Sequence, residues 1–250
     1  MKPITTIDDV IEALDSIIDE CHATENTLGY FAVLYKKVTV KVKKGISSGF
    51  FENGPRMEKL DVVFAKRYID AYFAWKEDET VTSSWKKAFS RTKDKKLLVI
   101  QHLLLGMNAH INLDLGIAAV EVAGKNRIEE LENDFNKIND ILALLVDDVQ
   151  KGLSSIWPFL RKILKLSGKV DNYLVDFSMK IARDGAWKFA TELAAFEIIH
   201  RPEQIKLRDE KVAAKSTIIT SPGKWVLFLL WFIRLTESSS VAQNINKLKQ

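Results

Sequence analysis

The amino-acid sequence predicts an all-α fold, with about eight or nine helices packed around a buried central helix. Turn-forming residues are scarce, because the 250 residues include only 11 Gly and 5 Pro, and an all-β chain with many tight turns needs more of both. Hydrophobic residues recur at three- and four-residue steps along most of the chain, which is the spacing of one helix face. One long segment, residues 95–123, is apolar on almost every side and is therefore typical of a buried helix.

No repeat, low-complexity tract or linker divides the chain. With 250 residues, 47% of them hydrophobic, it is long enough to bury a sizeable core. We therefore expect residues 1–250 to form a single all-helical domain.

The first half of the sequence predicts helices separated by turn-forming residues. Ile7 and Val10 begin an amphipathic pattern with acidic residues between the apolar ones. The β-branched run 38–42 in the second helix would also suit a strand, and residues 47–55 form a loop. Gly124 ends the apolar central helix. In order, these helices cover residues 6–21, 28–46, 57–75, 84–89 and 95–123.

The second half follows the same pattern. Asn126 can cap the helix after it, and Pro158 is tolerated in the first turn of a short helix. Gly168 separates that helix from a long one, which continues after Pro202 as a polar segment. Residues 216–223 are expected to form a loop. The helices predicted here cover residues 127–151, 153–166, 170–199, 225–238 and 241–248.

Charge and cysteine content indicate a non-secreted, cytoplasmic protein. The single Cys21 cannot form an intramolecular disulfide, and the acidic start of the chain does not resemble an export signal. A net charge of +4 is too small and too scattered to predict a nucleic-acid surface. The sequence leaves the oligomeric state open.

The most apolar short stretch, residues 225–233, has nine consecutive apolar side chains. It is too short to cross a bilayer, which takes about 20 residues, so no transmembrane segment is expected there. A core helix is the first interpretation. The alternative is a surface that contacts a membrane or a protein partner through Trp225 and Trp231.

The central helix carries polar residues on two opposite sides. At 100° per residue, His110 and Asp114 share one face. The amides of Gln101, Asn108 and Asn112 form a strip on the other. Because buried polar groups cost free energy when they are unpaired, partners on neighbouring helices are required.

Two interpretations of the His110 and Asp114 face remain open. They could be catalytic residues that together hold a divalent metal. Alternatively, the His110 imidazole could act as a base that the Asp114 carboxylate orients. They could also be a structural polar network that fixes helix packing. His102 lies near the edge of the same face and could line the same cavity.

Two further pairs lie in otherwise apolar helical stretches: Arg67 with Asp70, and Arg183 with Asp184. An arginine beside a carboxylate is most often a structural ion pair, and the alternative is recognition of a ligand phosphate or carboxylate. No glycine-rich phosphate loop, dinucleotide fingerprint or nucleophile elbow accompanies them.

Several segments of the sequence resemble DUF5995, a mainly bacterial family of unknown function. The strongest similarity runs from Gln101 through His110 to Leu115, and others lie at residues 49–61 and 183–187. The resemblance implies one domain and singles out the central helix. It implies no activity.

The leading hypothesis is an internal polar pocket on the segment Asn108–Asp114 that binds a small molecule or ion. Gln101, His102, Arg67, Asp70, Arg183 and Asp184 are further candidate ligand-binding residues. One alternative is a metal-dependent hydrolase that uses His110 and Asp114. The other is an interaction or membrane-surface protein that uses residues 225–233.

Overall fold

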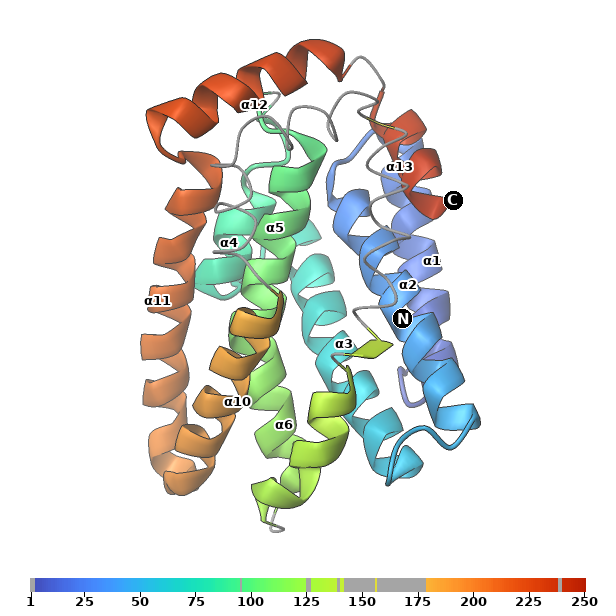
Figure 1. The fold of residues 1–250 in the computed structure, drawn as a ribbon, viewed down its shortest axis with the longest axis vertical. Helices are drawn as coiled ribbons and strands as arrows, with labels where there is room; N and C mark the ends of the chain where they lie inside the picture. The colour runs from blue at the N-terminus through green and yellow to red at the C-terminus, as the bar shows by residue number, and fades with distance from the viewer. Residues whose placement is uncertain are drawn as a thin grey trace.

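The computed structural model describes residues 3–94, 96–124, 127–138, 140–141, 156, 179–237 and 240–250. Every regular element within these ranges is a helix, which confirms the all-α prediction (Figure 1). The described residues hold ten α-helical segments, two of which join through a π-helical turn into one continuous helix.

The first half of the chain forms α1 (Ile7–Ala23), α2 (Leu28–Ser47), α3 (Gly54–Lys76) and α4 (Ser83–Phe89). Thr6 and Asp9 make a capping box at the start of α1. The β-branched run 38–42 is helical, because Thr39 and Val42 are buried within the bundle. There tertiary packing outweighs strand propensity. Asn53 caps α3 by accepting a hydrogen bond from the Arg56 amide.

The central helix consists of α5 (Val99–Ala109), a π-helical turn η1 (His110–Asp114) and α6 (Leu115–Ala123). Gly124 ends it with a φ of 60°, as the glycine signal predicts. The helix begins at Val99 rather than near residue 95. It is long and apolar enough to cross a membrane, but 94% of its most apolar 18-residue window is buried inside the protein, as in a core helix.

Neighbouring helices surround the central helix. Figure 1 shows it in green along the middle of the bundle, with α11 and α10 on one side and α1 and α2 on the other. Two glycines let neighbours approach closely. A Cβ on Gly106 would lie 2.5 Å from Phe31 Cγ, and one on Gly116 would lie 3.0 Å from the Ala186 carbonyl oxygen.

The second half differs from the prediction in several bounds. The 3-10 turn η2 (Ile128–Leu131) starts the helical stretch that was expected at residues 127–151. The long helix α10 (Met179–Ala195) ends four residues before the predicted end at residue 199, and a 3-10 turn η3 (Ile198–His200) follows it. Asn126, most of residues 142–178 and the short helix expected at 153–166 lie outside the described residues.

The polar segment after Pro202 is a helix, α11 (Arg201–Thr220). The loop expected at 216–223 is therefore wrong for residues 216–220. Ser216 and Ile219 are buried, and α11 packs along α4 and α5. The true loop covers only residues 221–223, between α11 and α12 (Lys224–Thr236).

The C-terminal helix α13 (Val241–Lys249) packs on the first two helices of the chain (Figure 1). Ile245 is fully buried, and its side chain leaves no room for a Cβ on Gly29. The Asn244 side-chain amide donates to the Tyr30 hydroxyl at 3.4 Å. Contacts between the two ends of the sequence thus close the bundle.

Candidate functional site

His110 and Asp114 are in contact, as their shared helix face predicts. The distance between His110 Nδ1 and Asp114 Oδ2 is 3.2 Å, and both side chains are buried. The five residues from His110 to Asp114 form the π-helical turn. Such turns are rare and occur frequently at functional sites.

Asp114 also binds two side chains from other helices. Arg67 Nε of α3 donates to Oδ1 at 2.9 Å, and Trp85 Nε1 of α4 donates to Oδ2 at 2.8 Å. The predicted pair of Arg67 with Asp70 is wrong, since Asp70 is exposed and binds Lys66 instead. The carboxylate of Asp114 thus ties three helical segments together.

These contacts determine which nitrogen of the His110 ring carries the proton. With the Arg67 guanidinium beside it, Asp114 is a carboxylate and only accepts hydrogen bonds. His110 Nδ1 must therefore carry the proton and donate it to Asp114, which leaves Nε2 as an acceptor. Burial lowers the pKa of His110 despite the Asp114 carboxylate, so the ring is neutral near pH 7.

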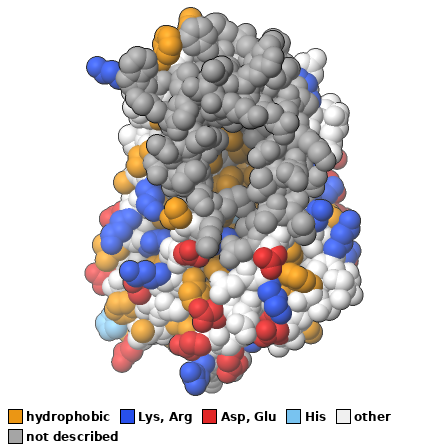
Figure 2. All heavy atoms as spheres, in the orientation of Figure 1, with side chains coloured by type: hydrophobic (Ala, Val, Ile, Leu, Met, Phe, Trp, Pro, Cys, Tyr) orange, Lys and Arg blue, Asp and Glu red, His pale blue; other side chains and the backbone are white. Residues whose placement is uncertain are grey.

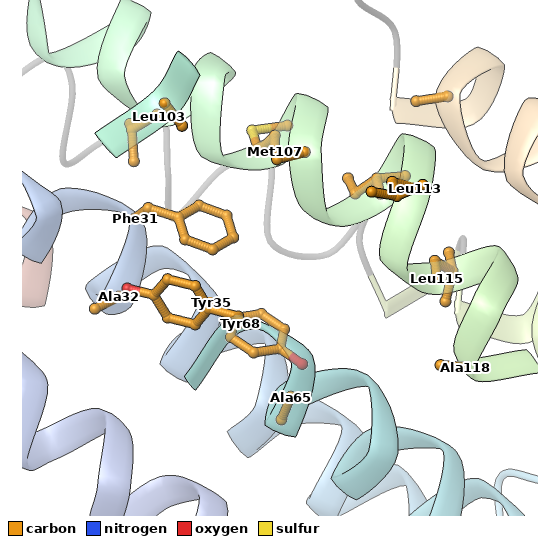
Figure 3. Packing of buried hydrophobic residues seen from close by; sticks show 14 of the residues in the cluster. Phe31, Ala32, Tyr35, Ala65, Tyr68, Leu103, Met107, Leu113, Leu115 and Ala118 are labelled. Atoms are coloured by element: carbon orange, nitrogen blue, oxygen red, sulfur yellow. The ribbon is translucent and has the colours of Figure 1, made fainter. Parts of the chain in front are cut away.

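Five aromatic rings surround the His110 imidazole. Phe64 stacks on it with the ring centroids 3.6 Å apart, and Tyr35 meets it edge-on at 4.5 Å. Phe31, Trp85 and Tyr68 follow at 5.7, 5.9 and 6.0 Å. Figure 3 shows Phe31, Tyr35 and Tyr68 between the ribbons of α2, α3 and the central helix.

Among the residues that the structure describes, several buried polar atoms of α2, α3 and the central helix make no hydrogen bond of normal geometry. We call them the polar cluster, and its members are His110 Nε2, Tyr35 Oη, Thr39 Oγ1, Asp61 Oδ2 and Tyr68 Oη. The Tyr35 hydroxyl interacts with Thr39, which leaves His110 Nε2, Asp61 Oδ2 and Tyr68 Oη without a partner. Most buried polar atoms in proteins are paired, so these three require an explanation.

Electrostatics connect the members of the polar cluster. Burial raises the pKa of Tyr35 well above its usual value, and the nearby Asp61, Asp114 and Tyr68 raise it further. Burial and the neighbouring Glu58 raise the pKa of Asp61 to about 8, so its carboxyl group is protonated at neutral pH. The cluster itself is therefore uncharged near pH 7.

The amide strip on the opposite face is hydrogen-bonded, and two of its three side chains reach α11. Asn108 Nδ2 donates to the Val212 carbonyl oxygen at 2.9 Å, and Asn112 Nδ2 donates to Asn108 Oδ1 at 3.1 Å. Gln101 Nε2 donates to the Ile219 carbonyl oxygen at 2.8 Å. These contacts support a structural role in helix packing for the three amides.

Comparison with known protein families identifies the family of the chain. A model of DUF5995, described as a family of unknown function, matches residues 7–222. The chain belongs to the DUF5995 family. The matched range contains every residue of the polar cluster together with Asp114, Arg67 and Trp85. No curated protein and no solved structure matches the chain.

The remaining candidate residues of this DUF5995 protein make their contacts elsewhere. His102 meets the Tyr30 ring edge-on, and burial lowers its pKa to about 4. Arg183 is buried, donates to the Phe135 carbonyl oxygen and lies over the Phe135 ring. Asp184 is exposed. The contacts found for His102 and Arg183 do not involve His110.

The sequence alone did not reveal several residues that build the candidate site. Trp85, Phe64 and Tyr35 appear in the sequence only as apolar periodicity. Arg208 of α11 was also missed: its Nε donates to the Asn112 carbonyl oxygen at 2.8 Å, inside the π-helical turn. A π turn shifts the backbone hydrogen-bond pattern. By donating to the Asn112 carbonyl oxygen, Arg208 helps to hold the segment that carries His110.

The residues around His110 do not fit a divalent metal. Both Asp114 oxygens already accept hydrogen bonds, and the Arg67 guanidinium, whose Nε lies 2.9 Å from Asp114 Oδ1, would repel a cation bound there. Among the described residues, no three His, Cys, Asp or Glu side chains form a group that could hold a metal ion.

Proposed function

We propose that this DUF5995 protein binds a small polar molecule at the polar cluster beside His110. The observation that carries the proposal is a set of buried polar atoms without partners, namely His110 Nε2, Asp61 Oδ2 and Tyr68 Oη. Each unpaired buried group costs about 1–3 kcal/mol. A bound molecule that pairs them would recover part of that cost, which favours binding.

The surroundings of His110 suit a preformed binding site. Asp114 fixes the ring by accepting from Nδ1, and Arg67 and Trp85 hold Asp114 from two other helices. Supporting hydrogen bonds of this kind keep a binding group in one orientation. The ring thus presents Nε2 in a fixed direction at little entropic cost.

The geometry favours this function over the metal-dependent hydrolase. The hydrolase requires Asp114 as a metal ligand, but its two oxygens are occupied by Arg67, Trp85 and His110. Ligand binding at Nε2 leaves all of these contacts in place.

A screen for thermal stabilisation by a library of small polar compounds tests the proposed function. Compounds that bind at the polar cluster should raise the melting temperature of the wild type and of His102→Gln, but not of His110→Ala. His102→Gln is the matched control, because His102 is a second buried histidine on the same helix. The proposal would be contradicted if every compound that raises the melting temperature of the wild type raised that of His110→Ala by the same amount.

One further observation favours a second candidate function, contact with a membrane surface or a protein. On α12, Leu227, Phe228 and Trp231 are 43%, 52% and 55% exposed, whereas Leu230 and Ile233 are buried. Residues 225–233 thus contribute Leu230 and Ile233 to the core, as the core-helix interpretation expects, and also expose three apolar side chains. Figure 2 shows hydrophobic side chains at the end of the molecule where α12 lies.

Sedimentation with lipid vesicles tests the membrane form of this candidate. Wild-type protein should pellet with vesicles that contain anionic lipid, because its net charge is +4. Trp231→Ala should pellet less. Ile218→Ala is the control, since Ile218 is an exposed apolar residue on α11. Wild-type protein that stays in the supernatant would exclude membrane binding.

A further inference from the structure

The helix α12 lies across the end of the bundle at which the central helix begins (Figure 1). Two hydrogen bonds place its flanks there. Gln101 Nε2, in the first turn of α5, donates to the carbonyl oxygen of Ile219 near the end of α11, and α12 starts five residues later. The Val99 amide donates to the Glu237 carboxylate directly after α12. Both flanks of α12 are therefore tied to the start of the central helix.

The outward face of α12 is apolar. At 100° per residue, Leu227, Phe228 and Trp231 fall on one side of the helix, and the buried Leu230 and Ile233 fall on the other. Because the buried pair packs on the bundle, the three exposed side chains point away from it. A surface helix normally turns its apolar side inward, so α12 presents apolar surface beyond what the core needs.

A short stretch of the chain, which we call the basic segment, carries the excess of positive charge. Residues 86–96 hold six Lys or Arg and one Asp, a net charge of +5, whereas the whole chain has a net charge of +4. The rest of the protein is therefore close to neutral. The described basic side chains of this segment are all exposed, and they are Lys86, Lys87, Arg91, Lys93 and Lys96.

The protein itself leaves most of these charges without a countercharge. On α2, by comparison, Lys36 faces Asp15 of α1. In the part of the chain that the structure describes, the ion pair of the basic segment joins Arg91 to Asp94 at 3.6 Å, and its lysines form none. The described lysines of the basic segment are therefore available to anionic groups outside the protein.

The basic segment leads to the same end of the bundle as α12. The helix α4 begins beside Asp209 in the middle of α11, whose carboxylate accepts from the Ser84 amide at 2.8 Å. The chain then runs through the basic segment to Val99, which starts the central helix and binds Glu237. Lys96 is three residues from Val99. The end of the basic segment thus lies near the flank of α12.

Exposed lysines beside outward apolar side chains are the two parts of a membrane-binding surface. Anionic headgroups attract basic residues, and the boundary with the acyl chains accepts the apolar face of an interfacial helix. Tryptophan is enriched at that boundary. On the basis of the second candidate function, we infer that α12 and the basic segment together bind the surface of an anionic lipid bilayer. A bilayer suits this surface better than an acidic protein does, because it is fluid and needs no groove that matches α12.

Sedimentation with two kinds of lipid vesicle tests this inference. One kind is phosphatidylcholine alone, and the other contains about 30% phosphatidylserine. We expect wild-type protein to bind the second kind more tightly by about tenfold or more, and this preference to disappear at about 1 M salt, which screens the charges. Equal binding to both kinds at low salt would overturn the inference.

Two double charge reversals locate the charges that bind. Lys93→Glu with Lys96→Glu changes the basic segment, whereas Lys188→Glu with Lys206→Glu changes exposed lysines of α10 and α11 nearer the opposite end of the bundle (Figure 1). Each pair lowers the net charge by four units, from +4 to 0, so the total charge of the two variants is the same. On phosphatidylserine vesicles, the first variant should lose about tenfold or more in affinity and the second less than about threefold. Equal losses would show that only the total charge matters and would overturn the inference.

The variant Trp231→Ala tests the apolar part of the surface. It should weaken binding to both kinds of vesicle, because fewer apolar side chains enter the bilayer. Unchanged binding to phosphatidylserine vesicles would exclude α12 from the surface and would also overturn the inference. All the substituted side chains are exposed, and melting temperatures show that each variant is folded.

The results also separate the inference from the function on which it rests. If wild-type protein binds both kinds of vesicle equally and Trp231→Ala weakens that binding, the anionic preference is wrong and membrane contact through α12 stands. If wild-type protein pellets with neither kind, both are wrong.

Discussion

Among single residues, Asp114 holds the site together. Its two oxygens accept from His110, Arg67 and Trp85, which come from the central helix, α3 and α4. A carboxylate of this kind is stable in the interior because a charge partner and hydrogen bonds replace its water. Any change at Asp114 should therefore affect the stability of the protein and the orientation of His110 together.

Replacing Asp114 with Asn should lower the free energy of unfolding by about 1–3 kcal/mol, because Arg67 loses its partner in a largely buried position. Urea denaturation measures this change. Asp70→Asn is the matched control, since its ion pair with Lys66 is exposed, and a change within about 0.5 kcal/mol is expected there. Equal losses in both variants would show that the Asp114 contacts add nothing beyond a surface pair.

Asp61 should make stability depend on pH. Burial raises its pKa to about 8 in the folded state from the ordinary value of 3.8, so between these values the folded protein binds more protons than the unfolded chain. Stability from this group is therefore fully present below the unfolded pKa and is lost as the pH rises through the folded pKa. The buried His102 acts in the opposite direction, because its pKa is lowered to about 4.

The variant Asp61→Asn isolates the contribution of Asp61. Relative to this variant, the wild type should lose about 1.4 kcal/mol of unfolding free energy for each unit of pH between about 5 and 7. Denaturation of both proteins across this pH range measures the difference, and the histidine contributions cancel. Parallel stability curves would show that Asp61 ionises normally in the folded protein.

At the scale of elements, the central helix both packs closely against its neighbours and carries the candidate site. Its glycines let Phe31 and α10 approach closely, and its π-helical turn carries His110 and Asp114. Arg208 reaches that turn from α11 and also donates to the Gly185 carbonyl oxygen of α10 at 3.2 Å. The turn is thus fixed by two helices that are distant in sequence.

Gly116 and Gly185 should respond differently to substitution by Ala. A Cβ on Gly116 would meet the Ala186 carbonyl oxygen at 3.0 Å, so we expect Gly116→Ala to cost about 1–3 kcal/mol of stability. On Gly185 the nearest atom is Arg208 Nη2 at 3.8 Å, and Gly185→Ala should be neutral or stabilise α10 by about 0.4–1 kcal/mol. Thermal unfolding compares the two variants. A stabilising Gly116→Ala would mean that α6 and α10 pack less closely than described.

At the scale of the whole molecule, the two ends of the chain form one surface of the bundle. The helix α13 packs on α1 and α2, with Ile245 fully buried between them. Contacts between residues so far apart in sequence favour folding as one cooperative unit. The single domain expected for residues 1–250 is consistent with this packing and stays a prediction.

The variant Ile245→Ala tests that cooperativity. It should destabilise the protein by about 2–5 kcal/mol through the lost burial and the cavity left behind. Denaturation followed by fluorescence and by circular dichroism should show one transition at a lower denaturant concentration with an unchanged slope. Two separate transitions would indicate that the C-terminal helix and the central helix belong to independent units.

The sequence predicted much of the fold because helix periodicity is a local property. The segments now seen as α1 to α4 and the buried central helix follow from spacing that neighbouring residues define. The errors have tertiary causes. Residues 216–220 look like a loop by composition, but their burial against α5 extends α11. Leu227, Phe228 and Trp231 of α12 are exposed although the helix is mostly apolar in sequence.

The candidate site likewise combines contacts that the sequence predicts with contacts that depend on tertiary packing. The contact of His110 with Asp114 follows from a four-residue step on one helix, which the sequence by itself determines. Only the tertiary structure decided that Arg67 binds Asp114 rather than Asp70, because that choice depends on how α3 packs on the central helix. It also decided that Tyr35, Thr39 and Asp61 join His110 in the polar cluster. Spacing along one chain segment carries no information about which faces of separate helices meet.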